Sequence, residues 1–204
     1  MTSTALAPRT ATTAVELHPL LADRWSPRAF DRTPLADDDV TALLEAARWA
    51  PSANNYQPWR FLVGRTTAEG ADATYTGLLE SLAEFNLLWA SAAPVLIAAV
   101  VEVEHEDGSP REIAPYALGL AVSQLTVEAA ARGLHVHQMG GFDAGRLSEA
   151  FGVPPQYRAV VDLAVGRLGD PETLPSWAAE RETAPRDRKP LAEIAFTGTW
   201  GNAA

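Results

Sequence analysis

Two short basic segments near opposite ends of the chain carry the side chains best suited to binding an anion. They consist of Arg24, Ser26, Arg28, Arg186, Arg188 and Lys189. A guanidinium group binds phosphate through two parallel hydrogen bonds, and a hydroxyl can add another. A buried phosphate dianion would explain two such clusters in an acidic chain, whereas a solvated surface patch is the alternative for either cluster alone. The sequence has no Walker motif and no glycine-rich dinucleotide loop, so we expect side chains to hold the phosphate.

A segment rich in amides directly follows a run with helical periodicity. Residues 51–59 read Pro-Ser-Ala-Asn-Asn-Tyr-Gln-Pro-Trp, and the residues of interest are Pro51, Ser52, Ala53, Asn55 and Gln57. Side-chain amides both donate and accept hydrogen bonds, so they suit a flat ligand with a polar edge. A capped turn before a strand is the alternative, because asparagine favours such turns.

A pair of glycines ends the strand-like run Gln138-Met139-Gly140-Gly141. Glycines have no side chain, so their backbone can come very close to a flat ring and present an N–H group to it. A simple turn from strand to helix is the alternative.

The order of these segments resembles that of the nitroreductase family. The sequence Arg-x-Ser-x-Arg-x-Phe beginning at Arg24 looks like the phosphate-binding segment, and residues 186–189 look like the last phosphate contact. Residues 51–59 are similar to the loop that reaches the flavin from the partner subunit. Gly140 and Gly141 lie where the family packs backbone against the isoalloxazine ring. Asn86 resembles an asparagine that contacts the pyrimidine end of that ring.

The resemblance spans residues 20 to about 195, and it implies an α+β fold and a homodimer with two tightly bound FMN molecules at its interface. It also implies hydride transfer from NADH or NADPH to flavin N5, followed by reduction of nitroaromatic, quinone or flavin-type acceptors in a ping-pong cycle. We therefore expect no catalytic acid, base or nucleophile from the protein. An oxygen-dependent dehydrogenase or a dehalogenase on the same fold is an alternative. Relatives often carry a basic residue just after Asn86, but this chain continues Leu-Leu-Trp, so a non-catalytic flavin-binding protein is a third hypothesis.

The composition excludes several other classes. The 204 residues have a formal net charge of −10, which argues against binding to nucleic acid or to an anionic membrane surface. The longest nearly apolar run, residues 89–101, is too short for a membrane span. The absence of cysteine excludes disulfides and thiolate chemistry and fits the cytoplasm. His135 and His137 alternate on one strand face, but no third ligand follows, so we expect no metal site.

The elements that must position these residues follow from periodicity. Apolar residues at helical spacing predict helices over residues 37–50, 75–90, 113–132 and 143–151. Apolar or alternating runs predict strands over residues 60–63, 95–103, 134–139 and 157–167. Helices and strands mix without regular βαβ repetition, which favours an α+β fold with a mostly antiparallel sheet flanked by helices.

The chain is expected to form one FMN-binding domain. Residues 1–15 are rich in Thr, Ala and Ser and lack the apolar core of a secretory signal, so we predict a disordered tail before a domain of residues 16–204. Residues 170–204 carry several prolines and few core residues. We expect this segment to be an extended arm that is exchanged with the partner of a homodimer.

Overall fold

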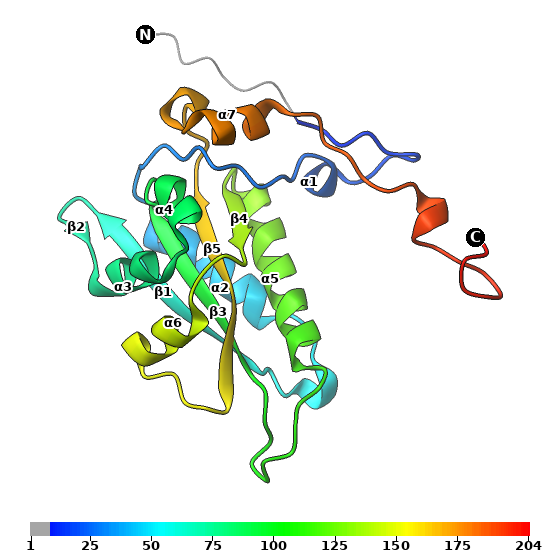
Figure 1. Cartoon of the computed structure of the whole chain (residues 1–204), viewed down its shortest axis with the longest axis horizontal. Helices are drawn as coiled ribbons and strands as arrows, with labels where there is room; N and C mark the ends of the chain where they lie inside the picture. Colours follow the sequence, from blue (N-terminus) through cyan, green and yellow to red (C-terminus); the bar gives the residue numbers. More distant parts are fainter. Residues whose placement is uncertain (1–8) are drawn as a thin grey trace.

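The centre of the fold is a five-stranded sheet in the order β2-β1-β3-β5-β4, in which neighbouring strands are antiparallel. A computed structural model describes residues 9–204 of the chain (Figure 1). The strands are β1 (Trp59–Thr67), β2 (Gly70–Ala71), β3 (Val95–Glu102), β4 (His135–Met139) and β5 (Tyr157–Gly166). The central strand β3 is buried over nearly its whole length because apolar residues point to both faces. The predicted α+β fold with an antiparallel sheet is confirmed.

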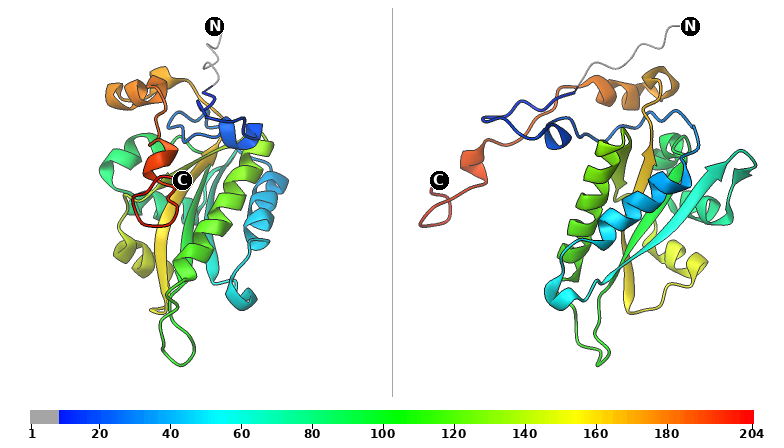
Figure 2. Two further views of the ribbon diagram at one scale, coloured as in Figure 1. Left: turned by 90° about the vertical axis from the view of Figure 1, so that its right-hand side faces the viewer. Right: turned by 180° about the vertical axis from the view of Figure 1, so that it is seen from behind.

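Helices cover both faces of the sheet and form a three-layer arrangement (Figure 2). The first face carries α2 (Asp37–Arg48) and α5 (Ala114–Ala131), which pack against Val95, Ile97, Ala99 and Val101. The second face carries α3 (Ala73–Ser81), α4 (Glu84–Ala90) and α6 (Ala144–Phe151), which pack against Leu96, Ala98 and Val100. The alternation along β3 therefore divides the molecule into two apolar cores.

Most helix termini follow the sequence signals. The acidic run at residues 37–39 forms the first turn of α2, where negative charge is favourable, and Arg65 from β1 forms an ion pair with Asp37 at 2.5 Å. Asp143 caps α6 by accepting a hydrogen bond from the Arg146 N–H at 2.9 Å. Gly152 ends α6 in the left-handed conformation, with φ 59°.

The single helix predicted over residues 75–90 is wrong, because the structure has two helices, α3 and α4. Leu82 and Ala83 leave the helical conformation. Leu82 forms a β-bridge with Phe142, and the Ala83 N–H donates to the Gly141 carbonyl at 3.0 Å. These pairings with the turn after β4 replace the helical hydrogen bonds, and no local sequence signal predicts them. The strand expected over residues 60–63 extends further, over residues 59–67, because β1 pairs along seven residues with β3.

The C-terminal segment extends away from the three layers (Figure 1). It contains short 3-10 turns and one helix, α7 (Ser176–Thr183), so it is not extended throughout as expected. Beyond α7 the side chains of Leu191, Ile194 and Trp200 are 60 to 92% exposed. The predicted N-terminal tail lies partly outside the described residues. Within its described part, the Ala11 N–H donates to the Ala22 carbonyl at 2.9 Å.

Candidate functional site

The first basic segment lies between α1 (Pro19–Ala22) and α2, and it packs on β4 and α4. The Pro27 carbonyl is 2.8 Å from His137 Nδ1, so Nδ1 carries the proton, because a carbonyl only accepts. The pKa of His137 is lowered to about 4, mainly by burial, so the ring is neutral at physiological pH. The Arg28 guanidinium lies 5.8 Å from the centre of the Trp89 ring. These contacts fix the segment against the edge of the sheet.

The second basic segment meets the first one directly. Arg186 donates to the carbonyls of Ala22 at 2.8 Å and Arg24 at 2.9 Å, and also to that of Arg9. Burial and then the charge of Arg188 lower the pKa of Arg24, which places these two cations near each other. Arg24 Nη1 also lies 3.4 Å from the Ser26 hydroxyl. Two regions that are about 160 residues apart in the sequence therefore form one site.

We define an arginine cluster as Arg24, Arg28, Arg186 and Arg188. A buried carboxylate close to Arg28, that of Glu182, binds its backbone N–H and not its guanidinium group. Within residues 9–204, none of the four forms an ion pair, whereas eight ion pairs involve other cations. Like charges held close together repel one another, and burial of Arg24 and Arg186 further destabilises their charged forms. A bound dianion would relieve the repulsion, so the cluster fits a phosphate group.

The paired glycines follow β4, the edge strand on which the first basic segment packs through His137. The Asn86 side chain from α4 donates to the Gly141 carbonyl at 3.0 Å. A Cβ on Gly141 would lie 2.5 Å from Cζ of Phe85, but a Cβ on Gly140 would meet nothing within 4 Å. Gln138 donates to the Thr126 hydroxyl at 3.4 Å. The backbone at Gly140 is therefore open for a flat group to approach, while Gly141 is closely packed.

The amide-rich loop lies at the other end of the molecule from the arginine cluster. The N-terminus of α5 lines a pocket with the loop, and Thr126 and Ala130 near its C-terminus line another with Arg24. Because α5 has 18 residues at about 1.5 Å rise per residue, one chain keeps the two regions well apart (Figures 1 and 2). The structure thus brings together the first, third and fourth predicted segments, and it does not bring Pro51, Ser52, Ala53, Asn55 and Gln57 to them within one subunit.

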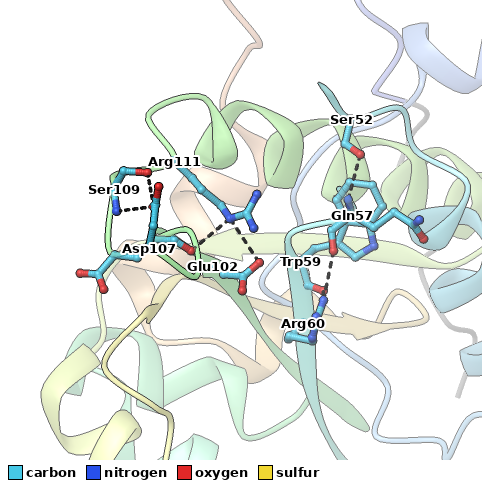
Figure 3. A network of polar contacts seen from close by, with 9 residues as sticks. Ser52, Gln57, Trp59, Arg60, Glu102, Asp107, Ser109 and Arg111 are labelled. Carbon is cyan, nitrogen blue, oxygen red and sulfur yellow. Dashed lines mark hydrogen bonds and ion pairs between the residues drawn. The ribbon is translucent and has the colours of Figure 1, made fainter. Parts of the chain in front are cut away.

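The loop is held in an uncommon conformation by its own polar groups (Figure 3). Asn54, Asn55 and Gln57 have positive φ values of 49°, 56° and 49°. The Ser52 hydroxyl accepts from the Gln57 N–H at 2.9 Å, and Gln57 Nε2 donates to the Asn55 carbonyl at 3.1 Å. Asparagine tolerates the left-handed region better than most residues, but three such residues in four positions still store strain.

A pocket of about 400 Å³ separates this loop from the hairpin of residues 104–113. Tyr56 lies at one wall, with the Arg111 guanidinium 4.7 Å from its ring centre and the His105 ring 5.8 Å away. The Arg111 side chain is 13% exposed and pairs with Glu102 at 3.4 Å (Figure 3). The pocket therefore offers aromatic and cationic groups beside the loop.

Two buried acids near the site were not predicted. Glu182 of α7 is fully buried, and its Oε1 accepts from the backbone N–H groups of Arg28 at 2.5 Å and Ala29 at 2.8 Å. Nothing local marks it, because Glu182 lies in a charged helical stretch that looks solvent-exposed. Asp162 of β5 is 2% exposed and opposite Met139. Its place in the apolar run Val-Val-Asp-Leu is a signal that could have identified it.

Metal-binding clusters and membrane-spanning helices are both absent from residues 9–204. No group of three or more His, Cys, Asp or Glu side chains is arranged to hold a metal ion in this part of the chain. None of the helices found there has the length and apolar character to cross a membrane.

The fold and the site define the class of protein. Residues 21–167 match the model of the nitroreductase family, and the chain belongs to this family. A crystal structure of an oxidoreductase containing FMN is 35% identical, with a TM-score of 0.87, covering 94% of this chain and 96% of that one.

Two sequence relatives complete the comparison. An uncharacterised 15.4 kDa protein of Mycolicibacterium smegmatis is 44% identical, over 70% of this chain and 98% of its own length. A Streptomyces coelicolor protein, provisionally named NADH dehydrogenase/NAD(P)H nitroreductase, is 29% identical over 74% of this chain and 83% of its own.

Proposed function

We propose that this protein is an FMN-dependent oxidoreductase that uses NADH or NADPH as electron donor. Bound FMN would accept hydride at N5 and pass the electrons to a nitroaromatic, quinone or flavin-type acceptor in a ping-pong cycle. The protein supplies the binding site, the orientation of the ring and the exclusion of water, and it needs no acid or base of its own. Family membership and the FMN-containing relative support this proposal.

The observation that carries the proposal is the arginine cluster, whose guanidinium groups form no ion pair within residues 9–204, together with the open backbone at Gly140. Arg24, Ser26, Arg28 and Arg188, with Lys189, would hold the phosphate. Both N–H₂ groups of Arg186 already donate to carbonyls, so Arg186 would add charge while it fixes the backbone. Gln138, Met139, Gly140 and Gly141 would lie along the ring, with Asn86 at its pyrimidine end. A phosphate site and a site for a flat ring on the same face of one subunit would suit a mononucleotide.

We further propose that the protein is a homodimer in which the amide-rich loop completes the site of the partner. The loop and the arginine cluster lie at opposite ends of α5, so one chain cannot bring both to the same ligand. The exposed apolar side chains of the C-terminal arm and of Tyr116 on α5, 72% exposed, give the second copy a surface to cover. The pocket beside Tyr56 would then open toward the bound ring of the partner.

Two alternatives concern the acceptor and the catalytic competence. An oxygen-dependent dehydrogenase or a dehalogenase would use the same site with a different pocket. A non-catalytic flavin-binding protein would retain FMN but show no turnover.

One experiment tests the proposal against the non-catalytic alternative. The purified protein is saturated with FMN, its mass in solution is measured, and the visible flavin band is followed anaerobically after addition of NADH or NADPH. We expect a mass of two chains of 21.8 kDa and a band that bleaches, then recovers when a quinone is added. A flavin band that does not bleach with either nucleotide would support the non-catalytic alternative, and failure to bind FMN would refute the proposal.

A further inference from the structure

Two side chains of the C-terminal segment, those of Glu182 and Arg186, form hydrogen bonds with the backbone at both ends of the first basic segment. We infer that Glu182 and Arg186 are positioning residues of the phosphate site, which act through the backbone rather than by touching the cofactor. This inference rests on the proposed FMN site. It gives α7 and the residues after it a role in shaping the site.

Glu182 holds the downstream end of the segment. Its Oε1 accepts two hydrogen bonds, from the backbone N–H groups of Arg28 at 2.5 Å and Ala29 at 2.8 Å. The carboxylate is fully buried and comes from more than 150 residues away in the sequence. Two adjacent N–H groups that point at one oxygen fix the direction of the peptide planes there. The Cα–Cβ direction of Arg28, and so the reach of its guanidinium, depends on this contact.

Arg186 holds the upstream end of the same segment. Its Nη1 donates to the Ala22 carbonyl at 2.8 Å and its Nη2 donates to the Arg24 carbonyl at 2.9 Å. The planar fork of a guanidinium fixes both carbonyls at once, which an ammonium group cannot do. Glu182 and Arg186 are four residues apart, so one short stretch of chain sets the spacing between Arg24 and Arg28.

Because Glu182 is negatively charged, a positioning role and an electrostatic role predict opposite effects of its removal on phosphate binding. Burial lowers the pKa of Arg28, and the Glu182 carboxylate opposes this effect, yet its negative charge also disfavours a nearby phosphate. If Glu182 acted by charge, its removal would tighten phosphate binding. If it acts by positioning, loss of the acceptor oxygen weakens binding, and a glutamine that keeps the oxygen preserves it.

The test compares the affinities of apo-protein variants for FMN and for riboflavin, which lacks the phosphate. For Glu182→Ala we expect the FMN dissociation constant to be roughly tenfold larger than that of wild type. This is at the lower end of what contacts that orient a ligand-binding residue contribute. The riboflavin dissociation constant should be unchanged. Glu182→Gln should bind FMN more tightly than Glu182→Ala and close to wild type, because the amide oxygen still accepts from both N–H groups. Glu180→Ala is the matched control, since Glu180 is exposed on the same helix.

The outcomes distinguish this inference from the proposed function. Wild-type FMN affinity in Glu182→Ala, tighter FMN binding, or an equal loss of FMN and riboflavin would each overturn the positioning role. If Glu182→Ala does not fold, Arg186→Lys provides the test, because it keeps the positive charge and loses the planar guanidinium group. Weaker binding of FMN with unchanged binding of riboflavin would support the inference. Unchanged affinity for FMN would refute it. Failure of the wild-type protein to bind FMN would instead refute the proposed function.

Discussion

The buried carboxyl group of Asp162 should make the protein less stable as the pH rises. Asp162 lies on β5 opposite Ala98 and Met139, in the core under α4 and α6. Neither of its carboxylate oxygens has a hydrogen-bond partner in the described part of the chain. Burial raises the pKa of Asp162 from its ordinary value of 3.8 to about 7. The perturbation to make is Asp162→Asn, which removes the ionisation and nearly preserves the shape.

The expected magnitude follows from this pKa. Well below pH 3.8 the carboxyl group is protonated in both the folded and the unfolded chain, so ionisation costs nothing. Above pH 3.8 the unfolded chain loses the proton while the folded chain keeps it up to about pH 7, so unfolding becomes more favourable. At 1.36 kcal/mol per pKa unit the full cost is about 4 kcal/mol. Roughly 2–3 kcal/mol of this should develop between about pH 5 and about pH 8.

The assay is urea unfolding of wild type and Asp162→Asn at several pH values, at one protein concentration and with saturating FMN. We expect the free energy of unfolding of Asp162→Asn to exceed that of wild type by an amount that grows by about 2–3 kcal/mol over this range. His137 on the neighbouring strand also has a shifted pKa, but it is present in both proteins and cancels in the difference. A difference that does not change with pH would refute the reasoning and show that the carboxylate is solvated.

Three further predictions test the site and the arm. Arg188→Ala should weaken FMN binding by about tenfold or more, the value of one charged hydrogen bond, whereas Arg60→Ala should leave the dissociation constant unchanged; equal constants would contradict the assignment. Truncation after Gly169 should give a less stable protein with little FMN by absorbance, and a truncated dimer that keeps its FMN would count against the role of the arm. Gly141→Ala should cost about 1–3 kcal/mol in thermal unfolding, because its Cβ would lie 2.9 Å from the amide nitrogen of the buried Asn86, which is held by its hydrogen bond to the Gly141 carbonyl, while Gly140→Ala should unfold like wild type but bind FMN more weakly.

The sequence predicts the parts of the fold that local periodicity controls. The apolar run of β3, the helical spacing in α2 and α5, and the cap of α6 all appear within a few residues of their expected positions. The break between α3 and α4 could not be predicted, because it results from pairing of Leu82 and Ala83 with the turn after β4. Long-range backbone contacts of this kind leave no periodic signal.

The same distinction applies to the site. The two basic segments attract notice because their residue types suit a phosphate, and the fold brings them together although they are distant in the sequence. Their role in binding a phosphate stays a prediction. Glu182 was missed because an isolated glutamate in a polar helix looks solvent-exposed, and only the tertiary fold buries it against the Arg28 backbone. The separation of residues 51–57 from the arginine cluster also depends on the length and direction of α5.

The contacts of Glu182 and Arg186 with the segment of residues 22–29 determine when, during biosynthesis, the phosphate site can form. Ribosomes add about 5–20 residues per second, and the N-terminal parts of a chain emerge and begin to fold first. The segment carrying Arg24 and Arg28 is made early, but Glu182 and Arg186, which hold it, follow more than 150 residues later. A nascent chain can therefore complete its sheet while the phosphate segment is still unsupported. We expect it to bind FMN at full affinity only after residues 182–186 have left the ribosome.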